Sequence, residues 1–116
     1  MDRLQTRVNS SDAAFKSNHE HNSTLLATLR ERLDDVQEGG GGKYVEKHRS
    51  RGKALPRERI SAICDPGAPF LELSPLAAYD LYDGNAASAG MVTGIGVVHG
   101  KECLFVANDA TVKGGS

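Results

Sequence analysis

Four consecutive glycines, Gly39–Gly42, constrain the fold of this chain more than any other feature. Glycine loses more conformational freedom than any other residue when a helix forms, and it commonly follows a helix end. Apolar residues recur at helical spacing before the run, at Leu25, Leu29, Leu33 and Val36. Ser23 or Thr24 is placed to cap the start of that helix. The sequence therefore predicts a helix that begins near residue 23 and ends at the glycines.

The residues on either side of this helix carry no apolar pattern. Residues 1–23 are rich in Asn, Ser and His, which predicts an extended arm with little core of its own. The glycine run lacks the Lys-Ser/Thr pair that completes a nucleotide-binding loop, so a mobile linker is favoured over a phosphate cradle. We therefore divide the chain into residues 1–42, an arm and helix that end in a Gly-rich linker, and residues 43–116, the start of a further domain.

Positive charge is concentrated in one short block, residues 43–59. This block carries seven basic and two acidic residues, whereas the whole chain has a net charge of -1. A local cationic block between acidic flanks suits a specific anion better than a long polyanion, so a general nucleic-acid binder is disfavoured. Charge runs are most often a solvated surface, and that interpretation remains open here.

The cationic block is expected to be helical on both sides of Gly52. Residues 43–51 predict a short basic helix that ends at that glycine. Pro56 is placed where a first helical residue is tolerated, and Ile60 and Ile63 mark the buried face of the helix that follows. One of Arg57 and Arg59 is expected to pair with Glu58 or Asp65 rather than with a ligand.

A β-hairpin is predicted in the C-terminal third. Residues 91–98 and 101–107 are two apolar runs separated by His99-Gly100, a two-residue turn. The glycines Gly94 and Gly96 permit a close approach of other groups to the first strand. Residues 70–73 predict a shorter strand, and residues 74–90 an irregular surface loop anchored by Tyr79 and Tyr82.

A polar, glycine-containing stretch, residues 108–116, follows the hairpin. A strand followed by a polar turn and glycines points backbone N–H groups at a ligand. Asp109 is expected to cap the turn rather than act as a base, because no neighbouring His supports the second role. The tentative anion-binding residues are the cations of the basic block and the end of this stretch, namely Arg49, Arg51, Lys53, Lys113, Gly114 and Gly115.

Several classes of function find no support. The two cysteines, Cys64 and Cys103, have neither metal nor redox spacing, and they are expected to be reduced and buried. The four histidines show no metal spacing, and no nucleophile–base constellation is present. No run is long enough to span a membrane, and residues 1–4 do not resemble a targeting segment. We expect a cytoplasmic protein if the source is bacterial, and a mitochondrial matrix protein if it is eukaryotic.

Five stretches together resemble the carboxyltransferase (β) subunits of biotin-dependent acyl-CoA carboxylases. They are Gly39–Lys43, His48–Ile60, Cys64–Leu73 with its Asp-Pro-Gly-Ala-Pro-Phe core, Gly90–Gly96 and Ala107–Ser116. The forms of residues 51–59 and 108–115 are most like the β subunit of 3-methylcrotonyl-CoA carboxylase, with geranyl-CoA carboxylase a close second. Propionyl-CoA carboxylase usually differs in both places.

The resemblance implies an α/β crotonase-like fold, with this chain as the N-terminal portion of the first of two carboxyltransferase domains. It implies carboxyl transfer from carboxybiotin to an acyl-CoA at an interface between β subunits, with biotin carried by a partner α subunit. For 3-methylcrotonyl-CoA the product is 3-methylglutaconyl-CoA, a step of leucine degradation. Backbone N–H groups stabilise the enolates, and the family's oxyanion-hole residues lie beyond Ser116. No catalytic residue and no metal ligand is therefore expected within these residues.

Two alternatives stay open at this stage. The first is a non-catalytic module of the same fold that binds CoA or another anion, or that serves assembly. The second is a nucleic-acid binder that uses residues 43–59, which would show a steep salt dependence, whereas a CoA site would show competition by free CoA. The 116 residues are expected to be poorly stable and inactive in isolation.

Overall fold

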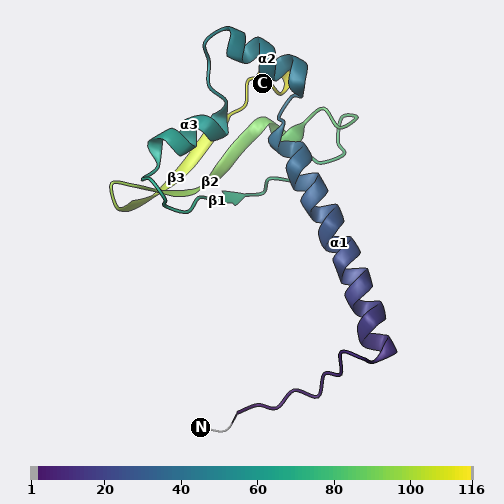
Figure 1. Cartoon of the computed structure of the whole chain (residues 1–116). Coiled ribbons are helices and arrows are strands. Elements are labelled where there is room, and N and C mark those ends of the chain that lie inside the picture. Colours follow the sequence, from purple (N-terminus) through teal and green to yellow (C-terminus); the bar gives the residue numbers. More distant parts are fainter. Residues whose placement is uncertain (1–2, 116) are drawn as a thin grey trace. The chain divides into compact units, whose positions relative to one another are not determined.

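The computed structural model describes residues 3–115. Its internal contacts divide the chain into two compact units, Met1–Glu31 and Arg32–Ser116, and each is described by itself. Figure 1 shows the elements in chain order. They are the helices α1 (Ala13–Gln37), α2 (Gly42–Ser50) and α3 (Pro56–Ile63), the strands β1 (Leu71–Leu73), β2 (Met91–Val98) and β3 (Lys101–Asn108), and the 3-10 turns η1 (Ala87–Gly90) and η2 (Lys113–Gly115).

Helix α1 begins about ten residues before the predicted start, so the expectation of an extended arm through residue 23 is wrong. A tight turn at Asn9 starts the helix, since its side-chain oxygen accepts the Ser11 N–H at 3.0 Å. Thr24 does not cap a helix; its hydroxyl donates to the carbonyl of Glu20, one helical turn earlier. The side chains of residues 3–27 are all exposed, so the expected lack of a core in this segment is confirmed.

The glycine run ends α1 as predicted, and only Glu38 and the three glycines Gly39–Gly41 separate this helix from α2. Gly39 has a positive φ of 58° and donates its N–H to the carbonyl of Val36. The N–H of Gly40 donates to Thr111 Oγ1 at 3.0 Å. A Cβ atom added at Gly40 would overlap the backbone carbonyl of Thr111. Gly39 and Gly40 thus form a packed joint, not the mobile linker that the composition indicates.

Helices α2 and α3 lie where the sequence predicts them. Gly52, just beyond α2, has a φ of 72° and donates to the carbonyl of Arg49, which is a glycine helix end. Pro56 opens α3, and the Glu58 carboxylate accepts the N–H of the preceding Leu55 at 2.8 Å. Ile60 is buried as predicted, but Ile63 is 55% exposed because it lies in the last turn, where no other part of the described chain covers it.

The three strands form one antiparallel sheet in the order β1-β2-β3. Val98 pairs with Lys101 across a turn in which His99 and Gly100 both have positive φ, so the predicted two-residue hairpin is confirmed. The Asp65 carboxylate accepts the backbone N–H groups of both turn residues at 2.7 Å. These two bonds hold the pKa of Asp65 below its ordinary value, with the Gly100 N–H as the larger cause.

Helix α3 packs on one face of this sheet, against β2 and β3. The face has no room for side chains at two positions of β2. A Cβ atom at Gly94 would collide with the Phe70 ring, and one at Gly96 would lie 2.7 Å from the sulfur of Cys64 and 3.0 Å from the Phe105 ring. The predicted close approach at both glycines is therefore confirmed, and Phe70 and Phe105 meet there edge to face.

Candidate anion-binding site

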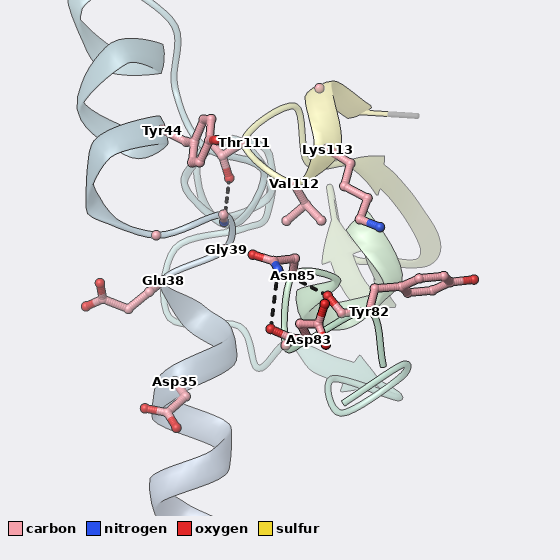
Figure 2. Close-up of a pocket in the computed structure, with 14 residues that line it drawn as sticks. Asp35, Glu38, Gly39, Tyr44, Tyr82, Asp83, Asn85, Thr111, Val112 and Lys113 are labelled. Carbon is pink, nitrogen blue, oxygen red and sulfur yellow. Dashed lines mark hydrogen bonds between the residues drawn. The ribbon is translucent and has the colours of Figure 1, made fainter. Parts of the chain in front are cut away.

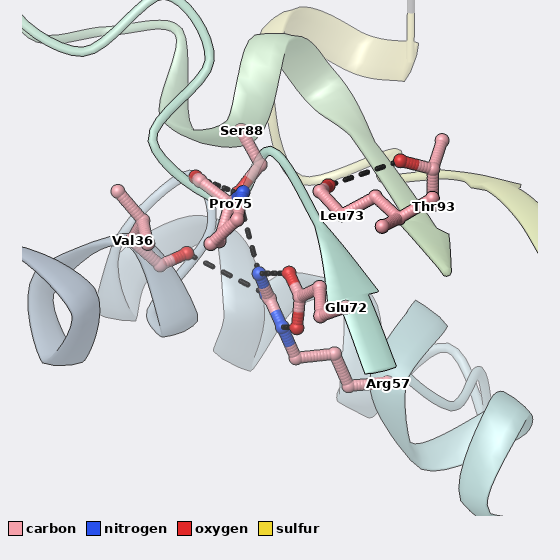
Figure 3. A network of polar contacts seen from close by, with 7 residues as sticks. All are labelled: Val36, Arg57, Glu72, Leu73, Pro75, Ser88 and Thr93. Carbon is pink, nitrogen blue, oxygen red and sulfur yellow. Dashed lines mark hydrogen bonds and ion pairs between the residues drawn. The ribbon is translucent and has the colours of Figure 1, made fainter. Parts of the chain in front are cut away.

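Two of the basic residues, Arg57 and Arg49, pair with carboxylates of the chain itself. The Arg57 guanidinium binds the Glu72 carboxylate through Nε at 3.1 Å and Nη2 at 2.7 Å, and both side chains are 22% exposed. It also donates to Ser88 Oγ and to the carbonyl of Val36, so α3, β1, η1 and the end of α1 meet at one cation (Figure 3). The prediction that Arg57 pairs with Glu58 or Asp65 is wrong, because Glu72 of β1 lies beside this face of α3.

Glu58 pairs instead with Arg49, whose Nη2 lies 2.5 Å from Glu58 Oε1. The pKa of Glu58 is lowered, first by the hydrogen bond from the Leu55 N–H and then by the charge of Arg49. Both side chains are about half exposed, so water screens the pair. Arg49 nevertheless carries a carboxylate neighbour, which reduces the positive field that it can offer to an anion.

Lys53 and Arg59, two further cations of the block, line a groove of about 380 Å³. Its lining comes from the basic block and from the polar stretch that follows β3, namely His48, Lys53, Ala54, Pro56, Arg59, Asn108 and Ala110. No carboxylate is among these residues, so the groove is cationic. The structure thereby brings together two stretches that the sequence analysis singled out separately, and that lie about fifty residues apart.

A hydrogen-bonded turn holds the far wall of this groove. Asp109 is 5% exposed, and its Oδ1 accepts the N–H of Thr111 at 2.9 Å and the Thr111 hydroxyl at 2.6 Å. The same hydroxyl oxygen accepts the N–H of Gly40, and the Asp109 N–H donates to the carbonyl of Gly90. The turn-capping role predicted for Asp109 is confirmed. Asn108 and Ala110, on either side of it, are left exposed to the groove.

A second and larger groove, of about 840 Å³, is lined in part by the glycine joint (Figure 2). Lys113 and Gly114 line it, and Lys113 Nζ lies 4.0 Å from the centre of the Tyr82 ring. Its walls also carry three carboxylates, Asp35, Glu38 and Asp83. Three carboxylates in the lining disfavour a polyanion at this position.

The six predicted anion-binding residues are therefore distributed over the surface. Lys53 lines the cationic groove, Arg49 is paired, and Arg51 is exposed but lines neither groove. Lys113 and Gly114 line the acidic groove, and Gly115 donates its N–H to the carbonyl of Val112 within η2.

Sequence reasoning did not assign His48 and Arg59 to the site. Arg59 follows Pro56 by three residues in α3, and residues at that spacing share a helix face. Pro56 and Arg59 indeed line the same groove, so this spacing was an available signal. The Nε2 atom of His48 lies 3.2 Å from the carbonyl of Ala54, and no local pattern indicates that contact.

Residues 3–115 contain no group of three or more His, Cys, Asp or Glu side chains arranged to hold a metal ion. Cys64 and Cys103 are free thiols and are half-buried, not fully buried. Within the same residues, no helix is both long enough and apolar enough to cross a membrane.

Comparison with known proteins defines the class. Residues 47–116 match the carboxyl transferase domain model. Because the match covers more than half of the chain, this protein belongs to the carboxyl transferase family. It spans about a fifth of the length of the curated relatives that it matches.

Within the family, the chain is similar to methylcrotonyl-CoA carboxylase β chains. It is 49% identical over 113 residues to the mitochondrial methylcrotonoyl-CoA carboxylase beta chain of Arabidopsis thaliana, covering 97% of this chain and 19% of that one. It is 52% identical over 92 residues to the biotin-dependent 3-methylcrotonyl-coenzyme A carboxylase beta1 subunit of Mycobacterium tuberculosis, covering 79% and 17%. Among solved structures, the β subunit of P. aeruginosa geranyl-CoA carboxylase matches with a TM-score of 0.82 at 37% identity, covering 97% and 21%.

Proposed function

We propose that this chain supplies part of the acyl-CoA binding surface of a carboxyl transferase that moves a carboxyl group from carboxybiotin to an acyl-CoA. The observation that carries the proposal is the cationic groove between α3 and the turn after β3. Lys53 and Arg59 provide positive charge there, and no carboxylate lines the groove. The phosphates of a CoA are bound by such groups, with Arg as a planar fork and Lys as a point charge.

The acyl group that we propose is 3-methylcrotonyl, which would be carboxylated to 3-methylglutaconyl-CoA. The support is identity, since the relatives named for methylcrotonyl-CoA are about 50% identical to this chain and the geranyl-CoA relative is 37% identical. Geranyl-CoA is the second candidate, because the structural likeness to that β subunit extends over 97% of this chain. A propionyl-CoA carboxyltransferase ranks third.

Biotin fits none of the grooves described above. Carboxyl transfer needs a site from which water is excluded, whereas both grooves are open to solvent and lined by charged side chains. We therefore derive no step through biotin for residues of this chain. The biotin-carrying α subunit and further β subunits are proposed as partners, and the crotonase-like fold as the architecture of the domain to which the sheet and helices contribute.

The role of each proposed residue follows from its position. Lys53 and Arg59 would bind phosphate oxygens of CoA, and the exposed Asn108 would offer its amide to the same ligand. The half-buried His48 would help to hold the Lys53 segment in place through its contact with Ala54. Arg51, exposed at the end of α2, remains a candidate. Lys113, Gly114 and Gly115 remain proposed for the part of the ligand beyond the phosphates.

Binding of free CoA to the chain tests the proposal, with calorimetry as the measurement. Lys53→Gln and Arg59→Gln are each expected to weaken CoA binding about fivefold, because each removes one partly solvated charge contact of about 1 kcal/mol. Lys101→Gln is the matched control, since Lys101 is also exposed but lies at the hairpin turn. Equal affinities for all four proteins would show that CoA does not use this groove.

The acyl group is tested separately. A full-length β subunit that carries this sequence, assembled with its biotin-bearing partner, is assayed with 3-methylcrotonyl-, geranyl- and propionyl-CoA. Preference for the first supports the proposal, whereas preference for either of the others would overturn the choice of acyl group and leave the class unchanged. Activity with none of the three, in a folded and biotinylated complex, would favour the non-catalytic module.

A further inference from the structure

The loop before η1 contains Asp83-Gly84, the single Asp-Gly pair of the sequence, and no Asn-Gly pair occurs. In an Asp-Gly pair the backbone nitrogen of the glycine can attack the preceding side-chain carboxyl group, because glycine places no side chain beside that nitrogen. Apart from its two chain neighbours, no described residue lies within 4 Å of a Cβ atom added at Gly84. Packing therefore does not shield the attacking group.

The carboxylate of Asp83 is equally accessible. Residues 80–85 are all exposed, and within residues 3–115 the Asp83 side chain takes part in no hydrogen bond or ion pair. Figure 2 shows Asn85 beside it, but the Asn85 amide donates to the backbone carbonyl of Asp83, at 3.3 Å. Both reacting groups are thus exposed on adjacent residues of one loop.

The backbone of this loop is held by a few local contacts. Tyr82 and Asp83 have φ values of 54° and 57°, in the left-handed region that residues with a side chain rarely adopt. The Gly84 N–H donates to the carbonyl of Leu81 at 3.2 Å, and the Asn85 N–H to that of Tyr82 at 3.1 Å. Exposed turns of this kind open locally far more often than a core does. Opening releases the Gly84 nitrogen and lets the Asp83 side chain rotate toward it.

We propose that Asp83 is a site of spontaneous conversion to isoaspartate. In the first step the Gly84 nitrogen bonds to Cγ of Asp83, and the carboxyl hydroxyl leaves as water with the amide proton, which gives a succinimide ring. In the second step water opens the ring at one of its carbonyls. Cleavage at Cγ restores aspartate, whereas cleavage at the backbone carbonyl leaves a main chain that runs through Cβ and Cγ. The atomic composition is unchanged, so no oxidant, metal or cofactor is needed.

This conversion alters the wall of the acidic groove. Isoaspartate adds one methylene to the main chain between Tyr82 and Gly84, and its carboxylate hangs directly from Cα. The Tyr82 ring, whose centre lies 4.0 Å from Lys113 Nζ, and the two bonds from the Asn85 amide depend on the present course of this backbone. The groove therefore changes shape and charge placement at constant total charge. The inference does not depend on the proposed CoA groove.

Ageing of the purified chain tests the proposal. The chain is incubated for several weeks in neutral buffer, under conditions where circular dichroism shows it folded, and isoaspartate is located by peptide mapping with electron-transfer fragmentation. We expect Asp83 to convert at least about tenfold more than Asp80, the matched internal control. Asp80 is exposed in the same loop and has a φ of 62°, but Leu81 follows it. Equal conversion at both positions would overturn the role of Gly84.

A variant and a peptide separate the chemistry from the fold. Asp83→Glu keeps a carboxylate but would need a larger ring, so it should abolish labelling by an isoaspartyl methyltransferase with S-adenosylmethionine. A peptide of residues 79–87 gives the rate without the fold, and conversion in the chain within about tenfold of that rate supports an open loop. Slower conversion would show that the fold protects Asp83 and would overturn the proposal. The same mapping on a full-length subunit that carries this sequence must also find isoaspartate at Asp83, and unmodified Asp83 there would overturn it equally.

Discussion

The packed joint at Gly40 leads to a sharp prediction, because two glycines of one run have opposite surroundings. A Cβ atom at Gly40 would overlap the carbonyl group of Thr111, which belongs to the backbone and cannot turn aside like a side chain. Gly40→Ala must therefore displace the Thr111 turn, and this displacement should break the hydrogen bond from the Gly40 N–H to Thr111 Oγ1. Gly42, two residues later, is the first residue of α2 and has no neighbour within 4 Å of an added Cβ.

The magnitudes follow from these surroundings. Forcing a methyl group into a packed contact costs about 1–3 kcal/mol, and loss of the hydrogen bond adds about 1 kcal/mol. Gly40→Ala should therefore destabilise the chain by about 2–4 kcal/mol. Gly42→Ala should be neutral or stabilising by up to about 1 kcal/mol, because alanine is the better helix former.

Urea unfolding followed by circular dichroism measures both changes. With a slope of about 1 kcal/mol per molar urea for a small protein, the midpoint for Gly40→Ala should fall by about 2 M or more, or the variant should be unfolded in buffer. The midpoint for Gly42→Ala should stay or rise. Equal urea midpoints for the two variants would refute the claim that Gly40 is packed against Thr111, since a mobile linker would accept alanine equally at both positions.

Three further predictions concern the charged groups. Arg57→Met should lower the free energy of unfolding by about 1–3 kcal/mol in urea titrations, because it leaves the half-buried Glu72 without its partner. Arg59→Met, at an exposed position, should change that free energy by less than about 0.5 kcal/mol, and similar losses in the two variants would contradict the Arg57 network. Asp65→Asn should make the free energy of unfolding depend less on pH in the acid range. The pKa of Asp65 is lowered in the folded state, so its carboxylate contributes stability that is complete above the ordinary pKa of 3.8 and is lost as the pH falls below that value. Asp34→Asn, on the exposed surface of α1, is the control and should leave the pH dependence of stability unchanged in thermal melts between pH 2 and pH 6. The same pH dependence in both variants would exclude the role of Asp65. CoA binding should weaken as salt rises, and calorimetry that shows no salt dependence would argue against the charges of Lys53 and Arg59 as its source.

Local chemistry determined most of what the sequence predicted correctly. The hairpin depends on a two-residue turn between two apolar runs, the end of α2 on Gly52, and the start of α3 on Pro56, and each of these signals acts within a few residues. The start of α1 was missed because residues 16–22 are polar and residues 13–22 carry no apolar period, although hydrogen bonds of Asn22 and Thr24 to carbonyls one turn earlier are compatible with a helix.

The contacts that build the candidate site could not be predicted in this way. Gly40 meets Thr111 across 71 residues, and Arg57 meets Glu72 only because β1 lies beside α3. Composition indicated a cationic block, yet which of its charges are paired depends on these distant contacts. The predicted residues are divided between two grooves for the same reason, since Lys113 lies over the Tyr82 ring in the acidic groove and Lys53 lines the cationic one.

The bond between Gly40 and Thr111 also has a consequence for synthesis of the protein. At a translation rate of about 5–20 residues per second, the ribosome adds the 71 residues that separate them in roughly 4–14 s. During that interval the joint between α1 and α2 has no partner, and its glycines remain accessible to proteases and chaperones. The turn that closes the joint also walls the cationic groove. A nascent chain therefore cannot complete the wall of this groove before Thr111 has been synthesised.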